Sequence, residues 1–376
     1  MSTLKDHSAC SGCSLCLLVC PMWRYSRDIS LSAHGYAKAL QNGATANEIA
    51  PEIWSCSLCG ACDPVCPEQI DLTGMILKLR RHIFELSKIH DTVAQNPLPN
   101  PPPASEKLLA GHTGEGSVPS HAGGGQGGGK VVTYYGNINK LLHTQTLNAT
   151  MSAQASRRSV SQLKTDTIIL PGPALRKYPD LLARISTLSG SQNKYAIPDD
   201  DGTDISLILE TGGEIKTGRL QGFLDSLRGA NKIIVADGLL LKYLKQWLPE
   251  TNPISVGEAL SSHTAVRRSL RSTDLYVIEP RAYHADYQRL VKHYDRLRVE
   301  SGSAFNLDLQ RIAIPVNFRN LQQRLGLVAP DDEEQASWVL HGHRVSRIVV
   351  ECLEDRQTLE KVSHIPVVHL SELLPS

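Results

Sequence analysis

Eight of the nine cysteines in this 376-residue chain lie between Cys10 and Cys66, and their spacing has a chemical meaning. They form two runs that each follow the pattern C-x2-C-x2-C-x3-C-P. The first run consists of Cys10, Cys13, Cys16 and Cys20, followed by Pro21, and the second of Cys56, Cys59, Cys62 and Cys66, followed by Pro67. Crowded thiolates are ligands for soft metals and for iron–sulfur clusters. The repeated spacing therefore predicts two metal centres.

The spacing within each run favours iron–sulfur clusters over other thiolate sites. Three thiolates at three-residue intervals on a tight turn can face three irons of one cubane, and the fourth cysteine of the run binds the other cluster. One [4Fe–4S] cluster is therefore assigned to Cys10, Cys13, Cys16 and Cys66. The second [4Fe–4S] cluster is assigned to Cys56, Cys59, Cys62 and Cys20. The proline after each run lacks an N–H group and fixes the exit of the chain.

Two other uses of these cysteines are less consistent with the sequence. Four-cysteine zinc sites usually pair two C-x2-C units and do not need the third closely spaced cysteine. A disulfide framework suits a small secreted domain, whereas this chain is long and its first residues, MSTLKDHSAC, lack the apolar stretch of a secretory signal. The ninth cysteine, Cys352, lies in the apolar run IVVECL and is expected to be a buried small hydrophobe.

The residues around the two runs are expected to form a helical domain over residues 1–94. Thr45-x-x-Glu48 matches a capping box and predicts a short helix that continues toward Trp54. Asp71 is the predicted N-cap of a longer helix with an apolar face at helical spacing. That face consists of Leu72, Met75, Ile76, Leu79, Ile83 and Leu86. Two helices are thus expected to frame the second run.

The rest of the chain predicts a linker and a second folded region. Residues 95–129 contain PNPPP and GGGQGGG and are expected to be a Pro/Gly-rich linker. Residues 130–376 alternate β-branched runs with amphipathic stretches, which is typical of parallel α/β layers. The predicted strands are Val131–Tyr135, Thr167–Leu170, Ile205–Leu209, Lys232–Ala236, Leu275–Ile278, Arg347–Glu351 and Pro366–Leu370. The predicted helices include Leu175–Leu188, Thr217–Leu227, Leu240–Trp247 and Asp286–Arg298.

This α/β region contains an internal repeat. The segment TIILPGPALRKYPDLLARI from Thr167 is similar to LYVIEPRAYHADYQRLVKH from Leu275, and the segment from Lys232 is similar to that from Arg347. The order and rough spacing of the two segments are kept in both halves. Generic α/β periodicity is the alternative explanation, because such patterns recur widely. The predicted fold class is therefore α+β multidomain, with an α-helical domain of two [4Fe–4S] clusters followed by a duplicated α/β domain.

At this level of detail the chain resembles a known family, the heterodisulfide reductase C/B-like (Fe–S)-binding proteins. Residues 1–90, through WRYSRD and IWSCSLCGACDPVCP, look like the α-helical two-cluster ferredoxin module of heterodisulfide reductase. The same module occurs in the iron–sulfur subunits of anaerobic glycerol-3-phosphate dehydrogenase and of glycolate or lactate oxidase. The region over 130–376 resembles the partner module of heterodisulfide reductase, its duplicated cysteine-rich (CCG) domain.

The second resemblance lacks the cysteines that define that domain. The positions that would carry them hold Asn137, Glu210, Thr211, Gly212, the stretch Ala236–Leu239 and Tyr287, while His284 and Cys352 are kept. One thiolate cannot hold a four-ligand cluster, so the α/β domain is expected to keep the fold of its relatives and to have lost their metal. Such a domain can still offer a docking surface.

The resemblance implies an electron-transfer iron–sulfur subunit of a larger oxidoreductase complex. It relays electrons between a redox partner, expected to be a flavoprotein dehydrogenase, and an acceptor, with a membrane quinone-reactive protein as another expected partner. Two alternatives stay open. In one, the α/β domain is a reductase that binds a substrate or cluster through Glu210, Asp237, His284 and Cys352. In the other, the chain is a scaffold whose clusters are structural.

Composition excludes several other classes of function. Lys and Arg (39) nearly balance Asp and Glu (38), so a large basic surface for nucleic acid is not expected. No run approaches 18 apolar residues, and no G-x-G-x-x-G follows a strand, so neither a transmembrane helix nor a nicotinamide or flavin site is predicted. The expected location is cytoplasmic, and any association with the inner face of a membrane is expected to occur through a partner protein.

Overall fold

A computed structural model describes residues 5–95, 166–189, 195–319, 321 and 330–374 of the chain. The predicted linker lies outside these residues from position 96 onward, as do the predicted strand Val131–Tyr135 and Asn137. The described residues form a helical N-terminal part (5–95) and an α/β part (166–374). In the part of the chain that is described, no helix is both long and apolar enough to cross a membrane.

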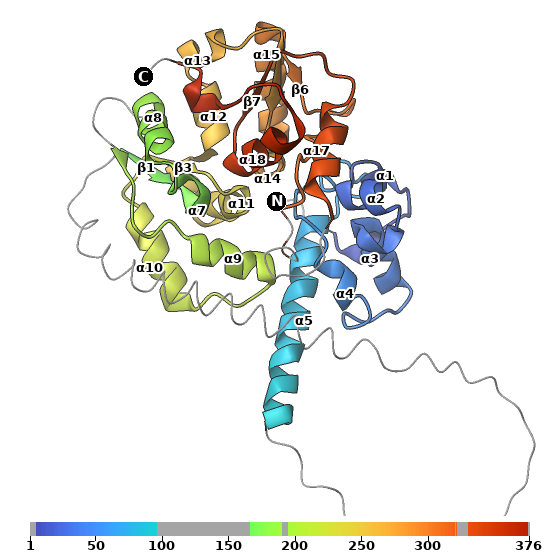
Figure 1. Cartoon of the computed structure of the whole chain (residues 1–376). Helices are drawn as coiled ribbons and strands as arrows, with labels where there is room; N and C mark the ends of the chain where they lie inside the picture. Colours follow the sequence, from blue (N-terminus) through green and yellow to red (C-terminus); the bar gives the residue numbers. More distant parts are fainter. Residues whose placement is uncertain (1–4, 96–165, 190–194, 320, 322–329, 375–376) are drawn as a thin grey trace, which may run out of the picture.

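The N-terminal part consists of short helices beside one long helix (Figure 1). Its elements are η1 (His7–Ala9), α1 (Leu15–Leu18), α2 (Pro21–Ser26), η2 (Ile29–Leu31), α3 (Ala33–Gln41), α4 (Ala50–Ile53) and α5 (Leu72–Gln95). Asp71 caps α5, as predicted, because its Oδ1 accepts the Gly74 N–H at 2.9 Å. The Thr45–Glu48 pair closes a turn instead of opening a helix, so α4 begins only at Ala50.

The α/β part contains two four-stranded sheets with the same topology. The first sheet has the order β2 (Tyr195–Ala196), β1 (Thr167–Leu170), β3 (Lys232–Val235), β4 (Pro253–Ser255). The second has the order β6 (Ala304–Phe305), β5 (Asp274–Val277), β7 (Arg347–Val350), β8 (Val367–His369). All pairs are parallel, and the central registers correspond, Thr167 with Lys232 and Asp274 with Arg347. The region thus consists of two halves whose sheets share one strand order.

Helices connect the parallel strands in both halves. The first half adds α7 (Gly172–Leu175), α8 (Pro179–Ser189), α9 (Thr203–Thr211), α10 (Thr217–Leu227), α11 (Gly238–Trp247), η4 (Pro249–Thr251), α12 (Val256–Ser261) and α13 (Thr264–Arg268). The second half adds α14 (Pro280–Ala285), α15 (Tyr287–Ser301), α17 (Asp332–Leu340), α18 (Leu353–Val362) and η5 (Leu370–Glu372). The helix predicted over Thr217–Leu227 is confirmed at both ends.

One strand prediction is wrong. Ile205–Leu209 was expected to be a strand because of its apolar run, but it lies within helix α9. A short apolar run is compatible with either a buried strand or a buried helix, and α9 is buried on nearly all sides. The other predicted strands within the described residues correspond to β1, β3, β5, β7 and β8.

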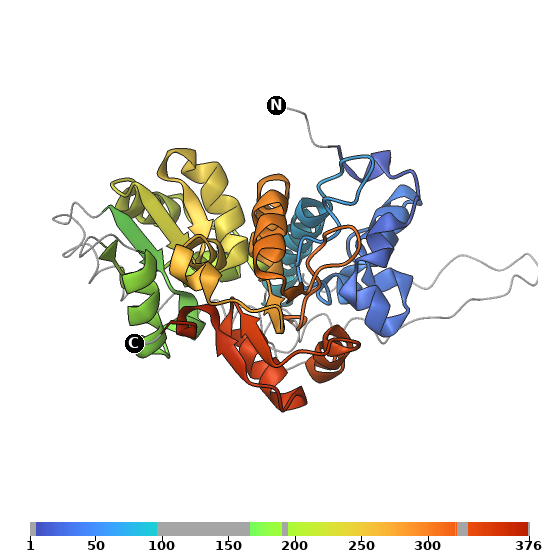
Figure 2. The ribbon, with the colours of Figure 1, turned by 90° about the horizontal axis from the view of Figure 1, so that it is seen from above.

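The N-terminal part and the α/β part pack against each other. Ile76 and Ile83 of α5 belong to the same hydrophobic core as Ile205 of α9 and Leu240 of α11. Gly212 lets the end of α9 approach α5 so closely that an added Cβ would collide with the α5 backbone at Arg81. Seen from above, the orange segment that includes α15 lies between the yellow-green first half and the blue N-terminal helices (Figure 2). The packing therefore brings both halves against the cysteine-bearing helices and loops.

Candidate iron–sulfur centre

The two cysteine runs adopt the same backbone turn. The residue before the second cysteine of each run has a positive φ, 80° at Gly12 and 53° at Leu58. The residue after the second cysteine does too, with 63° at Ser14 and 76° at Gly60. A non-glycine residue with positive φ is uncommon, so Ser14 and Leu58 mark a conformation that the fold imposes.

The structure brings the eight thiols together in two sets that cross between the runs. The pKa of Cys16 is raised to about 12, first by removal from water and then by its neighbours Cys10, Cys13 and Cys66. These four also line one cavity. We call them the first cysteine group. Its fourth member, Cys66, comes from the second run.

The second cysteine group consists of Cys20, Cys56, Cys59 and Cys62. Removal from water raises the pKa of Cys20 to about 12, and Cys56 and Cys59 add to the shift. Desolvation also raises the pKa of Cys62 well above its usual value, with contributions from Cys59, Cys56 and Cys20. In both groups the neighbouring thiols come from both runs. That each group is the ligand set of one iron–sulfur cluster stays a prediction.

The donor sets fit [4Fe–4S] clusters chemically. Thiols that are partly removed from water ionise readily only when a cation binds the sulfur, and iron supplies that charge. Each thiolate of a cubane binds a different iron, so the four sulfurs need not meet at one point. Within the described ranges, no three His, Cys, Asp or Glu side chains converge as ligands of a single metal ion.

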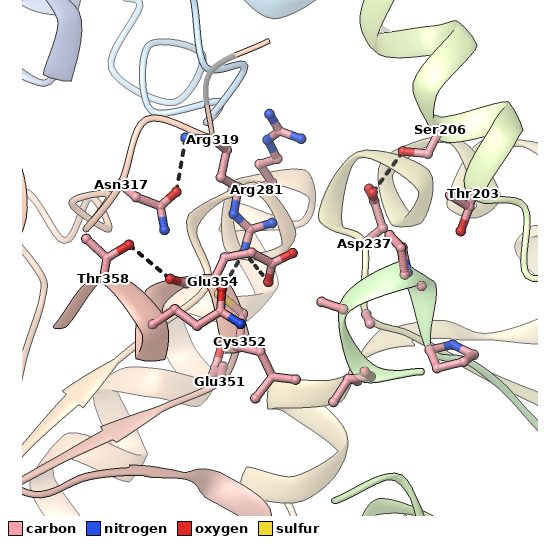
Figure 3. A pocket seen from close by; sticks show the side chains of 18 of the residues that line it. Thr203, Ser206, Asp237, Arg281, Asn317, Arg319, Glu351, Cys352, Glu354 and Thr358 are labelled. Carbon is pink, nitrogen blue, oxygen red and sulfur yellow. Dashed lines mark hydrogen bonds and ion pairs between the residues drawn. The ribbon is translucent and has the colours of Figure 1, made fainter. Parts of the chain in front are cut away.

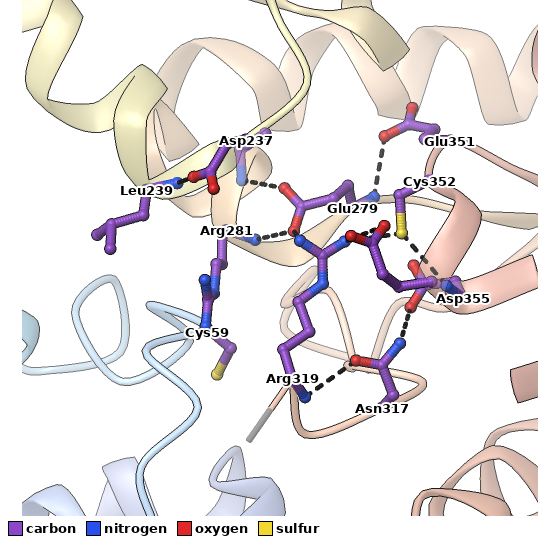
Figure 4. Close-up of polar contacts among 12 residues, drawn as sticks. Cys59, Asp237, Leu239, Glu279, Arg281, Asn317, Arg319, Glu351, Cys352 and Asp355 are labelled. Atoms are coloured by element: carbon purple, nitrogen blue, oxygen red, sulfur yellow. Dashed lines mark hydrogen bonds and ion pairs between the residues drawn. The ribbon is translucent and has the colours of Figure 1, made fainter. Parts of the chain in front are cut away.

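The two groups differ in their surroundings. Cys13 of the first group is exposed, and Leu18, within the first run, is 59% exposed. The loop of the second group is instead covered by the α/β part. Arg281 of α14 donates to the Ser57 carbonyl at 2.6 Å, and His284 Nδ1 lies 2.7 Å from the Cys59 carbonyl oxygen. Figure 4 shows Arg281 reaching from α14 toward Cys59.

A cavity of about 640 Å³ lies between the two halves of the α/β part. It opens where central strands end, because Pro171 follows β1, Asp237 follows β3 and Cys352 follows β7. Figure 3 shows Asp237 and Ser206 on one side and Arg281, Arg319 and Cys352 on the other. The carboxyl ends of parallel strands are the usual position of ligand sites in α/β folds.

The residues of the alternative catalytic site are only partly brought together. Glu210, Asp237 and Cys352 line the cavity, but His284 does not and instead faces the loop of the second cysteine group. Glu210 Oε1 pairs with Arg281 at 2.7 Å. Asp237 caps α11 and accepts a hydrogen bond from Ser206 at 2.9 Å. The polar atoms of these two carboxylates are therefore engaged in contacts within the protein.

Cys352 is buried, as expected, but it has polar neighbours. Burial raises its pKa well above the usual value, against the effect of nearby Arg319. Its Sγ accepts hydrogen bonds from Arg319 Nη2 at 2.7 Å and from the Asp355 N–H at 3.4 Å (Figure 4). Sequence reasoning missed Arg80, Arg281 and Arg319, because no local pattern distinguishes a buried arginine from an exposed one.

Comparisons with known proteins agree with the N-terminal assignment. Residues 6–70 match the family described as "4Fe-4S dicluster domain". Over 94 residues, the chain is 33% identical to a protein of Escherichia coli (strain K12) named "Uncharacterized electron transport protein YkgF". The match covers 22% of this chain and 18% of that relative, so the chain spans only about a fifth of its length. No solved structure gives a significant match.

These matches define the class of the N-terminal part. It is a 4Fe–4S domain of the ferredoxin type, and the region that matches includes all eight clustered cysteines, from Cys10 to Cys66. The α/β part lies outside the residues that match this family.

Proposed function

We propose that the chain is an electron-transfer subunit that relays electrons through two [4Fe–4S] clusters. The observation that carries this proposal is the pair of crossed four-thiol groups on two loops of the same backbone conformation. A [4Fe–4S] cluster supplies one-electron transfer without a change of ligands. The name of the E. coli relative, an electron transport protein, supports the same role.

We further propose that the chain is of the heterodisulfide reductase C/B-like type, with a CCG-like α/β part that has lost its cysteines. The two sheets of identical strand order support a duplication. At the position of one CCG element, Glu210 and Thr211 are buried and Gly212 packs against α5. Structural residues thus occupy a place where the family has ligands.

The relay has an accessible side and a covered side. The exposed Cys13 and Leu18 make the first cysteine group the place where a redox partner can approach, while α14 covers the loop of the second group. The partner that we propose is a flavoprotein dehydrogenase. A membrane quinone-reactive protein is the acceptor that would place the complex at the inner face of a membrane.

The test is metal analysis and reduction of the full chain purified without oxygen. Eight irons and eight acid-labile sulfides per chain, with an EPR spectrum of two interacting reduced [4Fe–4S] centres, are expected. Cys59→Ser should abolish electron transfer and leave assembly with the partner largely intact. Normal turnover of this variant would contradict the proposal, and clusters that cannot be reversibly reduced would favour the scaffold alternative.

The cavity between the two halves supports a second candidate function. Glu210, Asp237 and Cys352 line a space of about 640 Å³, which is within the usual size of a small-molecule site. In this alternative the α/β part binds a substrate or a further cluster, and the chain is a reductase. Substantially more than eight irons per chain would move this function to first place.

A further inference from the structure

Three side chains hold the loop of the second cysteine group by its carbonyl oxygens. Arg80 of α5 donates to the Cys56 carbonyl at 2.7 Å, and Arg281 donates to the Ser57 carbonyl through Nη2 at 2.6 Å and Nε at 3.1 Å. His284 contacts the Cys59 carbonyl at 2.7 Å. Two of these three side chains come from α14, so the α/β part contacts the loop directly through hydrogen bonds.

The hydrogen bonds of His284 indicate which of its ring nitrogens donates to the loop. The Ala313 N–H donates to Nε2 at 3.3 Å, so Nε2 carries a lone pair and Nδ1–H donates to the Cys59 carbonyl. The imidazole therefore contributes a hydrogen-bond donor to the loop, while the two arginines contribute charge.

Both arginines are buried beside the thiols. Arg80 is 0% exposed and Arg281 is 9% exposed, and both interact electrostatically with Cys56. Glu210 partly offsets Arg281 through the ion pair at 2.7 Å. The negative charge of Asp63 opposes the effect of the two arginines on Cys56. The Asp63 Oδ2 atom is itself 3.6 Å from Lys242 Nζ.

Arg24 adds a further cationic group near Cys20 and Cys59. Asp308 and Arg27 lie near Arg24, and Asp237 and Arg319 lie near Arg281. Arg80 and Arg281 are the buried cations that hydrogen-bond the loop itself.

The first cysteine group has a different environment. Lys38 Nζ donates to the Cys10 carbonyl at 3.2 Å and also to Gln41 at 2.7 Å. Cys13 is exposed, and the carboxylate-bearing Glu68 lines the same cavity as the thiols. Water and salt screen charges at such a site more strongly than at a buried one. A cation here should therefore act less on the cluster than Arg281 does on the other.

Reduction adds one negative charge to a cluster, and a buried cation nearby stabilises the reduced form. Hydrogen bonds, charge and exposure are the means by which a protein sets a cluster potential. We propose that Arg281, with Arg80 and His284, raises the reduction potential of the cluster in the second cysteine group. The α/β part, which covers this loop, thereby makes the cluster in the second cysteine group the one that is preferentially reduced. This inference rests on the proposed two-cluster relay.

The test is a potentiometric EPR titration of the anaerobic full chain and its variants. Arg281→Gln should shift the one-electron equilibrium of one cluster at least tenfold toward the oxidised form, a drop of about 59 mV. The potential of the other cluster should not change, and it serves as an internal reference. Arg281→Lys keeps the charge and should stay close to the unmodified chain, which separates charge from a structural role.

A matched variant addresses the other cluster. Lys38→Gln should lower the potential of the cluster that Arg281→Gln leaves unchanged, and by a smaller factor. His284→Leu, which removes one N–H donor, should lower the same potential as Arg281→Gln does.

The outcomes separate this inference from the proposed function. An unmodified chain without two reducible clusters would refute the relay itself. Two clusters whose potentials are the same in Arg281→Gln as in the unmodified chain would refute the tuning role alone. If Arg281→Gln does not retain eight irons, the His284→Leu variant tests the inference instead. An unchanged reduction potential of the cluster in the second cysteine group of that variant would overturn the inference.

Discussion

Gly60→Ala tests how tightly the α/β part holds the loop of the second cysteine group. Gly60 has a φ of 76°, and an added Cβ would lie 2.9 Å from the His284 Cβ. Gly43→Ala is the matched control, because Gly43 has a φ of 87° and nothing within 4 Å of an added Cβ. Both substitutions carry the cost of a left-handed alanine, about 1–2 kcal/mol. Only Gly60→Ala also pushes against α14.

The additional cost at Gly60 follows from the contact that is lost. Moving His284 away breaks its hydrogen bond of 2.7 Å to the Cys59 carbonyl and leaves that carbonyl without this donor. An unsatisfied group of this kind costs about 1–3 kcal/mol. Local opening of the loop should therefore be roughly 5- to 150-fold more frequent in Gly60→Ala than in Gly43→Ala.

Amide hydrogen exchange measures this difference on the full chain. Peptides that cover residues 57–62 should lose protection in Gly60→Ala and keep it in Gly43→Ala, and peptides of α14 should change together with the loop. Equal protection of the loop in the two variants would show that His284 and α14 do not hold it, and the reasoning would fail.

Three other changes have expected outcomes. Arg80→Met leaves three carbonyl oxygens without their donor and should destabilise the chain by roughly 3 kcal/mol, measured by thermal unfolding without oxygen. Burial raises the pKa of Glu351 to about 7, so the folded state retains a proton that the unfolded state loses, and the contribution of this group to stability should fall by up to roughly 3 kcal/mol as pH rises from 4.5 to 7. The difference in unfolding free energy between the unmodified chain and Glu351→Gln isolates this contribution from those of Asp355 and His369, and a difference that does not change with pH would contradict it. Gly218 lies in α10 and has open space around it, so Gly218→Ala should stabilise the chain by about 0.5–1 kcal/mol, because glycine loses more conformational freedom in a helix than alanine does. A lower unfolding temperature of this variant would contradict the prediction.

The cysteine groups could be predicted because their determinants are local. The spacing of each run defines the turn, and the repeat of that spacing implies the exchange of Cys20 and Cys66 between groups. The parallel strands could be predicted from the sequence for a similar reason, because β-branched runs such as Thr167–Leu170 alternate with amphipathic helices.

The covering of the second group could not be predicted, because it depends on contacts that are distant in sequence. Arg80 meets Glu210 across 130 positions, and Arg281 meets Ser57 across 224. Helix α9 was mistaken for a strand at Ile205–Leu209 for a related reason. It is buried on nearly all sides, in part against α5, and a short apolar run does not reveal whether such a buried segment is a helix or a strand.

Iron content of paired cysteine variants tests the crossed ligand groups most directly. Cys20→Ala combined with Cys56→Ala removes two ligands from one group, so the account predicts about four irons per chain and one remaining [4Fe–4S] EPR signal. Cys20→Ala combined with Cys16→Ala removes one ligand from each group and should leave neither cluster intact. The reverse result, one cluster kept in the second pair and both lost in the first, would contradict the crossed arrangement.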